Sequence, residues 1–238
     1  MPPAARPVIL DHVLALPRGL DPAASLVGAT RAAADAFSAE LAAAGFSEGS
    51  ARSHPGQGTA NRRLFLDDLM LECLLVDDEA ALDDPRGAAL GLGKRFRESG
   101  ASGLGIAFRP DPDAPGDLPS PDFPSVAYRP AYLPEDLHVD VARDATPGAP
   151  LLFHLPFARR AGAPGDGEPR GHANGARRVR SVGLEAPTAP PAATLEILEA
   201  AGVRCAPGPI ECLHVGLDGV PEAFELDLRP RFGLRLHA

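Results

Sequence analysis

The chain has 238 residues, of which 45% are hydrophobic, so it can bury the core of one large domain or two small ones. Its net charge of −9, with no basic block, argues against a nucleic-acid partner and against an anionic membrane surface. No apolar run reaches the length of a membrane span, and the start, MPPAARPVILDHV, lacks the apolar core of a signal peptide, so we expect a cytoplasmic protein.

The first unit of the chain is predicted over residues 1–77. A strand is predicted over 8–16, where simple alternation puts His12 on one face and Asp11 on the other. An Ala-rich helix follows over 30–44, with Thr30 as the candidate cap. Further strands are predicted at 46–53, 62–66 and 69–76. The order of this unit is therefore strand, helix and three strands.

Two more units are predicted, joined by linkers at 78–98 and 159–175. A second, helix-poor unit at 99–158 has strands at 103–109, 126–128, 137–142 and 151–157, with a proline-rich segment where a helix would be expected. A third unit at 176–232 has a strand at 179–185, a helix at 192–201 and strands at 210–217 and 223–228, with room for one more near Cys205. The pattern indicates weak internal repetition of one supersecondary unit.

Two polar side chains stand out because each lies in the middle of an apolar strand of the first unit. They are His12 in VILDHVLAL and Glu72 in LMLECLLV. A carboxylate is costly to bury without a partner. An imidazole and a carboxylate on one concave sheet face would suit a divalent metal or general acid–base catalysis. The alternatives are a plain hydrogen-bonded pair, or a glutamate that faces solvent.

A third candidate is His154, in the strand-like segment LLFHLPF. Together with His12 and Glu72 it would complete two histidines and one carboxylate, the set used by non-haem iron and related metals. The alternative is a histidine satisfied in the core or at the surface.

The loop HPGQGTAN precedes the strand that contains Glu72. Gly56 and Gly58 would let a ligand approach the backbone, so the loop is expected at the rim of a pocket. The expected rim residues are His54, Gly56, Gly58, Asn61 and Arg62. A phosphate cradle and a plain connector are the alternatives.

Three segments of the chain resemble a glyoxalase-like domain of the vicinal-oxygen-chelate superfamily. They are LDHVLAL from Leu10, HPGQGTAN followed by RRLFL, and LMLECLLVDD ending at Asp78, and they cover roughly the first third of the chain. SVAYRPAYLP, PLLFHLPF and HANGARRVRSV are similar to later segments of such proteins. The resemblance implies an α+β fold, in which repeated βαβββ modules form curved mixed sheets around a cleft. Pairing of modules within the chain and across a homodimer are both open.

The resemblance also implies a ligand set. In metal-using members, the first strand of a module offers His or Glu and the last strand offers Glu, positions that match His12 and Glu72. The second module departs from this pattern, since GLGIAFR has no ligand-type residue and PLLFHLPF offers His154 where a carboxylate is usual. The implied cofactor is a divalent metal (Fe, Mn, Zn, Ni or Co) held by His12, Glu72 and His154, with Glu72 also moving protons.

Three hypotheses about function follow. The first is a metal-dependent lyase, isomerase or dioxygenase, acting on a small substrate with vicinal oxygens that the metal polarises. The second is a non-catalytic protein that binds or sequesters a small molecule at a degenerate metal site. The third is a paralogue kept for stability or for partner interaction, which the segments around 109–124 and 159–176 could carry. No pattern in the sequence names the substrate.

Overall fold

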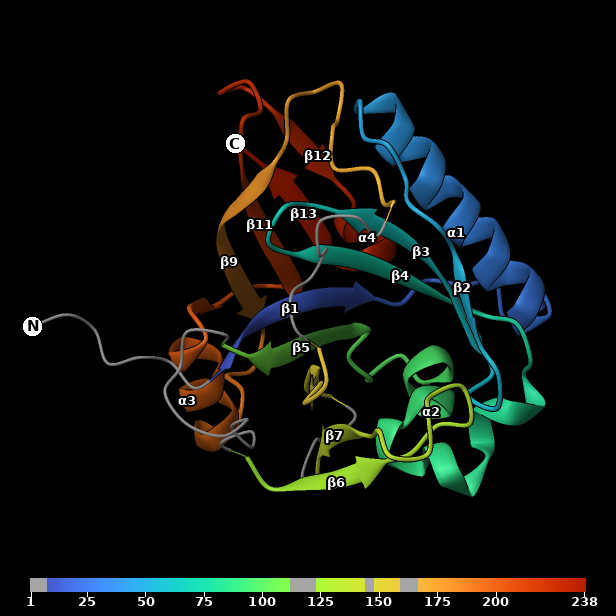
Figure 1. Ribbon diagram of the computed structural model, residues 1–238. Helices are drawn as coiled ribbons and strands as arrows, with labels where there is room; N and C mark the ends of the chain where they lie inside the picture. The colour runs from blue at the N-terminus through green and yellow to red at the C-terminus, as the bar shows by residue number, and fades with distance from the viewer. Residues whose placement is uncertain (1–7, 112–122, 144–147, 159–166) are drawn as a thin grey trace, which may run out of the picture.

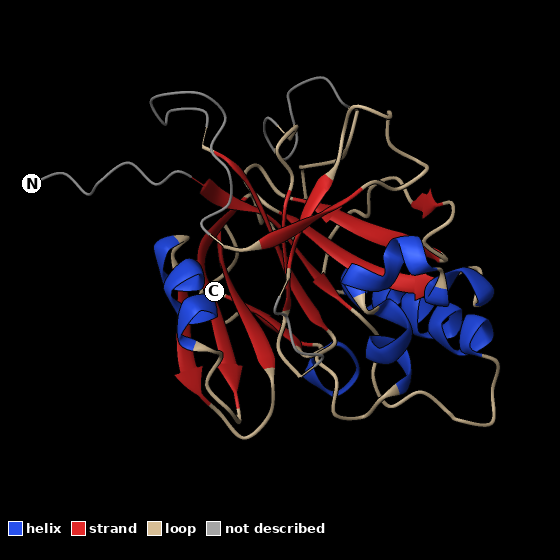
Figure 2. Ribbon diagram, turned by 90° about the horizontal axis from the view of Figure 1, so that it is seen from below, coloured by secondary structure: helices blue, strands red, loops and turns tan. Residues whose placement is uncertain are grey.

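The computed structural model describes residues 8–111, 123–143, 148–158 and 167–238, whose arrangement is shown in Figure 1. They form two mixed sheets, of eight and five strands. The helices lie mainly at two flanks of the molecule, with the strands between them (Figure 2). The predicted α+β fold of repeated modules with curved mixed sheets around a cleft is confirmed. Within the described ranges, no helix has both the length and the apolar character needed to cross a membrane.

The first module follows the predicted order. Its elements are β1 (Val8–Ala15), α1 (Leu26–Ala43), β2 (Arg52–His54), β3 (Thr59–Phe65) and β4 (Met70–Val76). The helix begins before Thr30 because Ser25 is the cap, its Oγ accepting a 3.2 Å hydrogen bond from the amide of Gly28. Thr30 is buried inside α1. Its hydroxyl donates to the carbonyl of Leu26 at 2.9 Å and accepts from the amide of Val76 at 2.9 Å, which ties α1 to β4.

The second module repeats the strand order of the first. After the 3-10 helices η1 (Ala80–Asp83) and η2 (Pro85–Leu90) and the helix α2 (Leu92–Arg97) come β5 (Leu104–Pro110), β6 (Ser125–Tyr128), β7 (Val139–Ala142) and β8 (Leu151–His154). In each module the first strand pairs with the last in parallel, as β1 with β4 and β5 with β8. No helix is found among the described residues between β5 and β6.

The two modules join through β1 and β5, which pair antiparallel in the centre of the eight-stranded sheet (Figure 1). The full strand order is β2-β3-β4-β1-β5-β8-β7-β6. Because the internal order is the same and the junction is antiparallel, the modules are related by an approximate two-fold axis. Pairing within the chain therefore builds one continuous sheet.

The third unit forms the second sheet. Its elements are β9 (Arg178–Ala186), α3 (Ala192–Ala200), β10 (Val203–Pro207), β11 (Cys212–Asp218), β12 (Glu225–Asp227), α4 (Arg229–Phe232) and β13 (Leu234–His237). The strand order is β10-β9-β11-β13-β12. The sequence did not predict α4 or β13, and β13 lies beyond the predicted end of the unit at residue 232. The domain boundaries otherwise stay a prediction.

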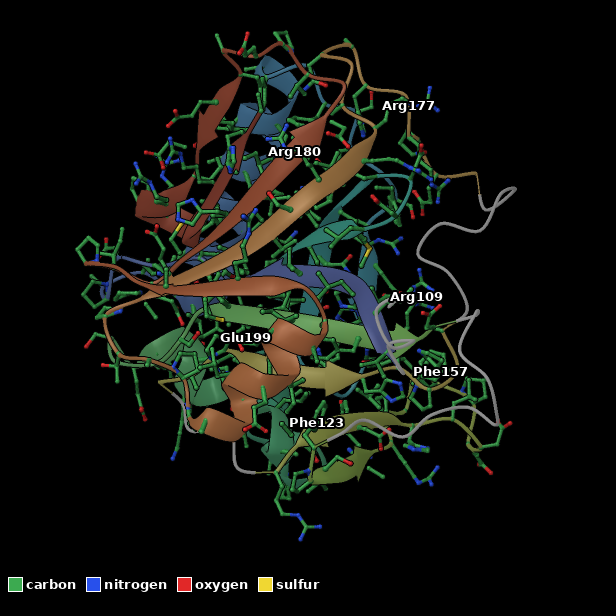
Figure 3. All side chains as sticks on the ribbon, turned by 90° about the vertical axis from the view of Figure 1, so that its left-hand side faces the viewer. Arg109, Phe123, Phe157, Arg177, Arg180 and Glu199 are labelled. Atoms are coloured by element: carbon green, nitrogen blue, oxygen red, sulfur yellow. The ribbon has the colours of Figure 1, made fainter. Side chains whose placement is uncertain are left out.

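One hydrophobic core joins the third unit to the outer face of the large sheet. It contains Phe37 of α1, Ile106 of β5, Val182 of β9 and Leu198 of α3. α3, which carries the labelled Glu199, lies in front of the second-module strands in Figure 3. The third unit thus occupies the outer side of the second module, where the first module has its own helix.

Candidate active site

A cavity of about 170 Å³ lies on the inner side of the eight-stranded sheet and takes side chains from both modules. Its charged and most of its polar lining comes from the first module, and the second module adds the hydroxyls of Tyr128 and Tyr132. The first-module residues are His12, Arg52, His54, Gln57, Asn61, Arg63 and Glu72. Its apolar lining is supplied largely by the second module and the helices before it, for example Leu90, Leu92, Leu133, Val139, Leu151 and Phe153. The cavity is therefore polar on one side and apolar on the other.

His12 and Glu72 meet in this cavity. Both residues are 7% exposed, and Nε2 of His12 lies 3.5 Å from Oε2 of Glu72. The strand register explains the meeting, because β1 and β4 are parallel neighbours in which Leu14 is paired with Glu72. His12, two residues before Leu14, faces the same side of the sheet. The structure brings this predicted pair together; its role as metal ligands or catalysts stays a prediction.

The carboxylate of Glu72 has a polar partner on each side. Its Oε1 accepts a 2.5 Å hydrogen bond from Nδ2 of Asn61 on β3, while Oε2 faces His12. These contacts explain how a charged group is tolerated in a buried strand. They also leave Oε2, rather than Oε1, as the oxygen available to a ligand.

Asp11 is a site residue that the sequence did not reveal. Its Oδ2 accepts a 2.8 Å hydrogen bond from Nδ1 of His12, and its Oδ1 lies 3.3 Å from Nε of Arg109. Strict alternation would have put Asp11 on the opposite face. However, the pairing of β1 with β5 shifts register between Leu10 and His12, so Asp11 is a bulge residue. A bulge re-aims the side chain locally, and here it brings a carboxylate next to the imidazole.

The surroundings of His12 favour its protonated form. Burial alone would lower the pKa of His12, but the hydrogen bond and charge of Asp11 and the charge of Glu72 outweigh it and raise the pKa. Asp11 also fixes the proton on Nδ1, so Nε2 is the nitrogen directed to Glu72. Arg109, beside Asp11, lies at the same end of the second-module strands as Phe157 (Figure 3).

The loop that was expected at the rim closes the sheet. Gln57 donates from Nε2 to Thr59 at 2.7 Å, and its Oε1 accepts from the hydroxyls of Tyr128 at 3.3 Å and Tyr132 at 3.0 Å. Gln57 lies between the edge strand β2 and β3, whereas Tyr128 lies on the opposite edge strand, β6. The two edges of the curved sheet thus meet at Gln57.

Four of the predicted rim residues lie in or beside this loop. His54 and Asn61 line the cavity. Gly56 and Gly58 have φ angles of 80° and 79°, values that L side chains rarely adopt, so glycine is required for this turn.

Arg62 corrects a prediction, because it does not reach the rim. Its guanidinium lies 2.6 Å from Asp35 of α1 and 3.6 Å from Glu48, on the outer face of the sheet. Its neighbour Arg63 lines the cavity instead. The prediction chose the wrong one of two adjacent arginines, which must face opposite sides of a strand.

His154 also departs from its prediction, because it does not join His12 and Glu72. Its neighbour Phe153 lines the cavity and packs edge-on against the His12 ring at 5.3 Å, so His154 faces the outer side of β8. There its Nδ1 lies 3.2 Å from Oδ2 of Asp140, and the side chain is fully buried. The proposed set of two histidines and one carboxylate is therefore not assembled.

The donor set can be tested against a divalent metal. The residues of β5 and β8 on the cavity side are Gly105, Ala107, Leu151 and Phe153, none of which is a metal ligand. Across the part of the chain that the structure describes, no group of three or more His, Cys, Asp or Glu is placed to hold a metal ion. His12 and Glu72 alone are fewer than the three protein ligands of a typical catalytic site, so these residues do not fit a complete metal centre.

Comparison with known proteins leaves the activity open. No protein-family model matches the chain, and no curated protein matches its sequence. Among solved structures, a hypothetical protein from Staphylococcus aureus is similar at 10% identity and a TM-score of 0.49, covering 97% of this chain and 98% of that one. Methylmalonyl-CoA epimerase in complex with methylmalonyl-CoA and NH4+ is similar at 18% identity and a TM-score of 0.36, covering 62% and 93%. Both TM-scores lie below 0.5, so function has to be inferred from the site itself.

Proposed function

We propose that the protein binds a small organic molecule in this cavity and transfers a proton at a carbon next to a carbonyl group, as an isomerase or lyase of the glyoxalase-like type. The observation that carries the proposal is the pair of acid–base groups, with Nε2 of His12 3.5 Å from Oε2 of Glu72 and both directed into one cavity. Two titratable groups with different surroundings, at the same point of a pocket with an apolar wall, are suited to general acid–base catalysis.

Each group has a distinct role in the proposed reaction. Glu72 takes a proton from the carbon through Oε2, because Asn61 occupies Oε1. His12 donates from Nε2 to the carbonyl oxygen, where negative charge develops. Its raised pKa keeps the imidazole protonated over more of the neutral range than usual. The intermediate is then an enol. An isomer forms when Glu72 returns its proton to a carbon of the enol and His12 takes back the hydroxyl proton as the carbonyl re-forms. A lyase product forms when the re-forming carbonyl instead expels a group from the next carbon, which takes the proton from Glu72 while His12 recovers its own.

Asp11 acts as a positioning residue in this scheme. Its 2.8 Å hydrogen bond holds the His12 ring, and its own charge is balanced by Arg109. The scheme routes no step through a metal, because the second module supplies no ligand on the cavity side. A metal-dependent dioxygenase would need donors beyond His12 and Glu72.

A non-catalytic binding protein is the second candidate. It is favoured by the apolar wall of the second module, which contributes Leu151 and Phe153 and adds no carboxylate or imidazole to the described cavity lining. Such a wall would hold a ligand without helping to transform it.

The test is a deuterium-exchange assay on small carbonyl compounds. Protein stripped with a chelator, and the same protein with added Mn²⁺ or Zn²⁺, is incubated with ketones, aldehydes and oxo acids in D₂O, and loss of the C–H signal is followed by proton NMR. Wild type should exchange at least one compound without metal. Glu72→Gln should slow the exchange by about 10²–10⁴-fold.

The matched control is Glu48→Gln, since Glu48 faces Arg62 on the outer side of the sheet. This variant should keep the wild-type exchange rate. Binding of a compound without any exchange would favour the binding protein. Exchange that appears only with added metal would support the metal-dependent enzyme of the first hypothesis instead.

A further inference from the structure

We infer that the ligand of this cavity is a small carboxylic acid with an apolar body, and that Arg52 binds its carboxylate at the mouth. The inference deepens the proposed function, and rests on it for the place of the reacting carbon. It makes a prediction about binding that can be measured separately.

The charge at the mouth is the first observation. Arg52 lines the cavity and is exposed, and no hydrogen bond or ion pair to its guanidinium is found among the described residues. Arg63, the other cavity-lining arginine of the first module, is already engaged: Nε donates to the carbonyl of Ser50 at 2.7 Å, and Nη2 lies 3.3 Å from Glu168. Arg52 is therefore the cation available to an incoming anion.

The second observation is that the backbone of Arg52 is fixed relative to the acid–base pair. Its amide donates to Oδ1 of Asn61 at 2.7 Å, and Nδ2 of the same Asn61 donates to Glu72 at 2.5 Å. One side-chain amide thus connects the strand that carries the arginine to the carboxylate in the cavity. An anion bound at the guanidinium of Arg52 would therefore lie within reach of one side chain from a point that is fixed relative to Glu72.

The third observation is a neutral donor close to Arg52. Thr59 Oγ1 accepts from Gln57 at 2.7 Å and lies 3.0 Å from Nδ1 of His54, so we assign the hydroxyl hydrogen to His54. That assignment leaves the imidazole proton on Nε2 as a donor. Burial lowers the pKa of His54. The negative charge of Glu72 opposes this effect and the positive charge of Arg52 supports it, so the net pKa is lowered and the neutral ring is favoured. A guanidinium and an N–H donor together match the acceptor oxygens of a carboxylate.

The remaining lining sets the body of the ligand. Leu90, Leu92, Leu133 and Leu151 give no hydrogen-bonding side chains, so they favour a hydrocarbon group. The cavity volume is about 170 Å³, and an apolar cavity of about 150 Å³ is known to hold benzene. A branched aliphatic or single-ring acid fits this limit.

The test uses two probes that differ in the carboxylate. They are 4-methyl-2-oxopentanoate and the neutral ketone 4-methyl-2-pentanone, whose dissociation constants are measured by NMR titration against wild type, Arg52→Gln and Arg62→Gln. Wild type should bind the acid more tightly than the ketone. Arg52→Gln should weaken acid binding on the order of tenfold or more, as expected for a lost hydrogen bond to a charged group, without changing ketone binding.

Arg62→Gln is the matched control, because Arg62 is paired on the outer face and should leave both constants unchanged. Equal binding of the two probes by wild type, or an equal loss of both in Arg52→Gln, would overturn the inference. Acid binding that needs Arg52 but shows no deuterium exchange would refute the proposed proton transfer alone. Exchange of neutral ketones that needs Glu72 but not Arg52 would refute only the carboxylate inference.

Discussion

The first and second modules share one strand order but differ on the inner face of the sheet. In the first module, the cavity side of the first and last strands carries His12 and Glu72. In the second, the corresponding strands carry Gly105, Ala107 and Phe153. The repeated backbone therefore supplies a symmetric frame, in which one copy carries an imidazole and a carboxylate and the other carries an apolar wall.

The modules also differ on the outer face. α1 covers the first module, with Phe37 fully buried, whereas the described part of the second module has no helix between β5 and β6. Ile106 and Leu152 of the second module share a core with Val182 and Leu198 of the third unit. The outer face of a sheet needs apolar cover, and for these second-module strands the third unit supplies it.

The largest expected effect is on stability and concerns α1, the helix that covers the outer face of the first module. Phe37 is fully buried and packs edge-on against Phe232 at 5.1 Å, so Phe37→Ala should lower the free energy of unfolding by about 3–5 kcal/mol. Urea denaturation followed by circular dichroism measures this loss. Val126→Ala is the control, since Val126 is 40% exposed and its loss should stay within about 0.5 kcal/mol. A similar small loss for Phe37→Ala would show that α1 is not a required cover.

The second prediction concerns α3 of the third unit, which shares a hydrophobic core with the outer face of the second module. Leu198 of α3 is fully buried, so Leu198→Ala should cost about 2–5 kcal/mol. If the third unit replaces a helix, hydrogen exchange should speed up at the amides of β5 and β8 as well as in α3. Exchange confined to α3 and its own sheet would mean that the second module is stable without this cover.

These differences show what the sequence could predict. The residue pattern singled out His12 and Glu72, because each interrupts an apolar strand, but the expectation that they face one pocket came from the family resemblance rather than from alternation alone. All four residues of β8 are buried, and no family pattern placed a histidine there. When both faces of a strand are covered, alternation no longer tells inside from outside, and His154 was placed on the wrong side.

The remaining errors also have local causes. The position of Asp11 depends on a bulge against β5, and this pairing cannot be read from β1 alone. Arg62 and Arg63 are adjacent and alike, so composition does not tell which of them faces the cavity. α4 and β13 are both short, at four residues each, and leave little periodic signal.

A third prediction tests the tie between α1 and the sheet. The hydroxyl of Thr30 accepts the hydrogen bond of the Val76 amide at 2.9 Å, so Thr30→Val leaves a buried donor unpaired. This change should cost about 1–3 kcal/mol in urea denaturation. Thr30→Ser keeps the hydroxyl and should cost less, and equal losses in the two variants would assign the effect to packing instead.

The smallest expected effect is electrostatic and concerns the acid–base side of the cavity. Asp11→Asn removes the charge that helps to raise the pKa of His12, so that pKa should fall, as measured by NMR titration of the imidazole signals. The signal of His54 is the internal control, because Asp11 is not among the groups that shift its pKa. An unchanged pKa of His12 would show that Glu72 alone sets it.

The same variant has a predictable effect on the pH dependence of stability. The folded pKa of His12 lies above its ordinary value of 6.5, so its contribution is fully present below that value and is lost as pH rises through the folded pKa. The stability difference between wild type and Asp11→Asn should therefore be largest in mildly acidic buffer and shrink on the alkaline side. The second module has no ionisable side chain at the matching cavity positions. Leu151→Val there keeps the contact of Phe153 with the His12 ring and should lower stability by the same amount at every pH. A flat difference for Asp11→Asn would remove His12 as the cause.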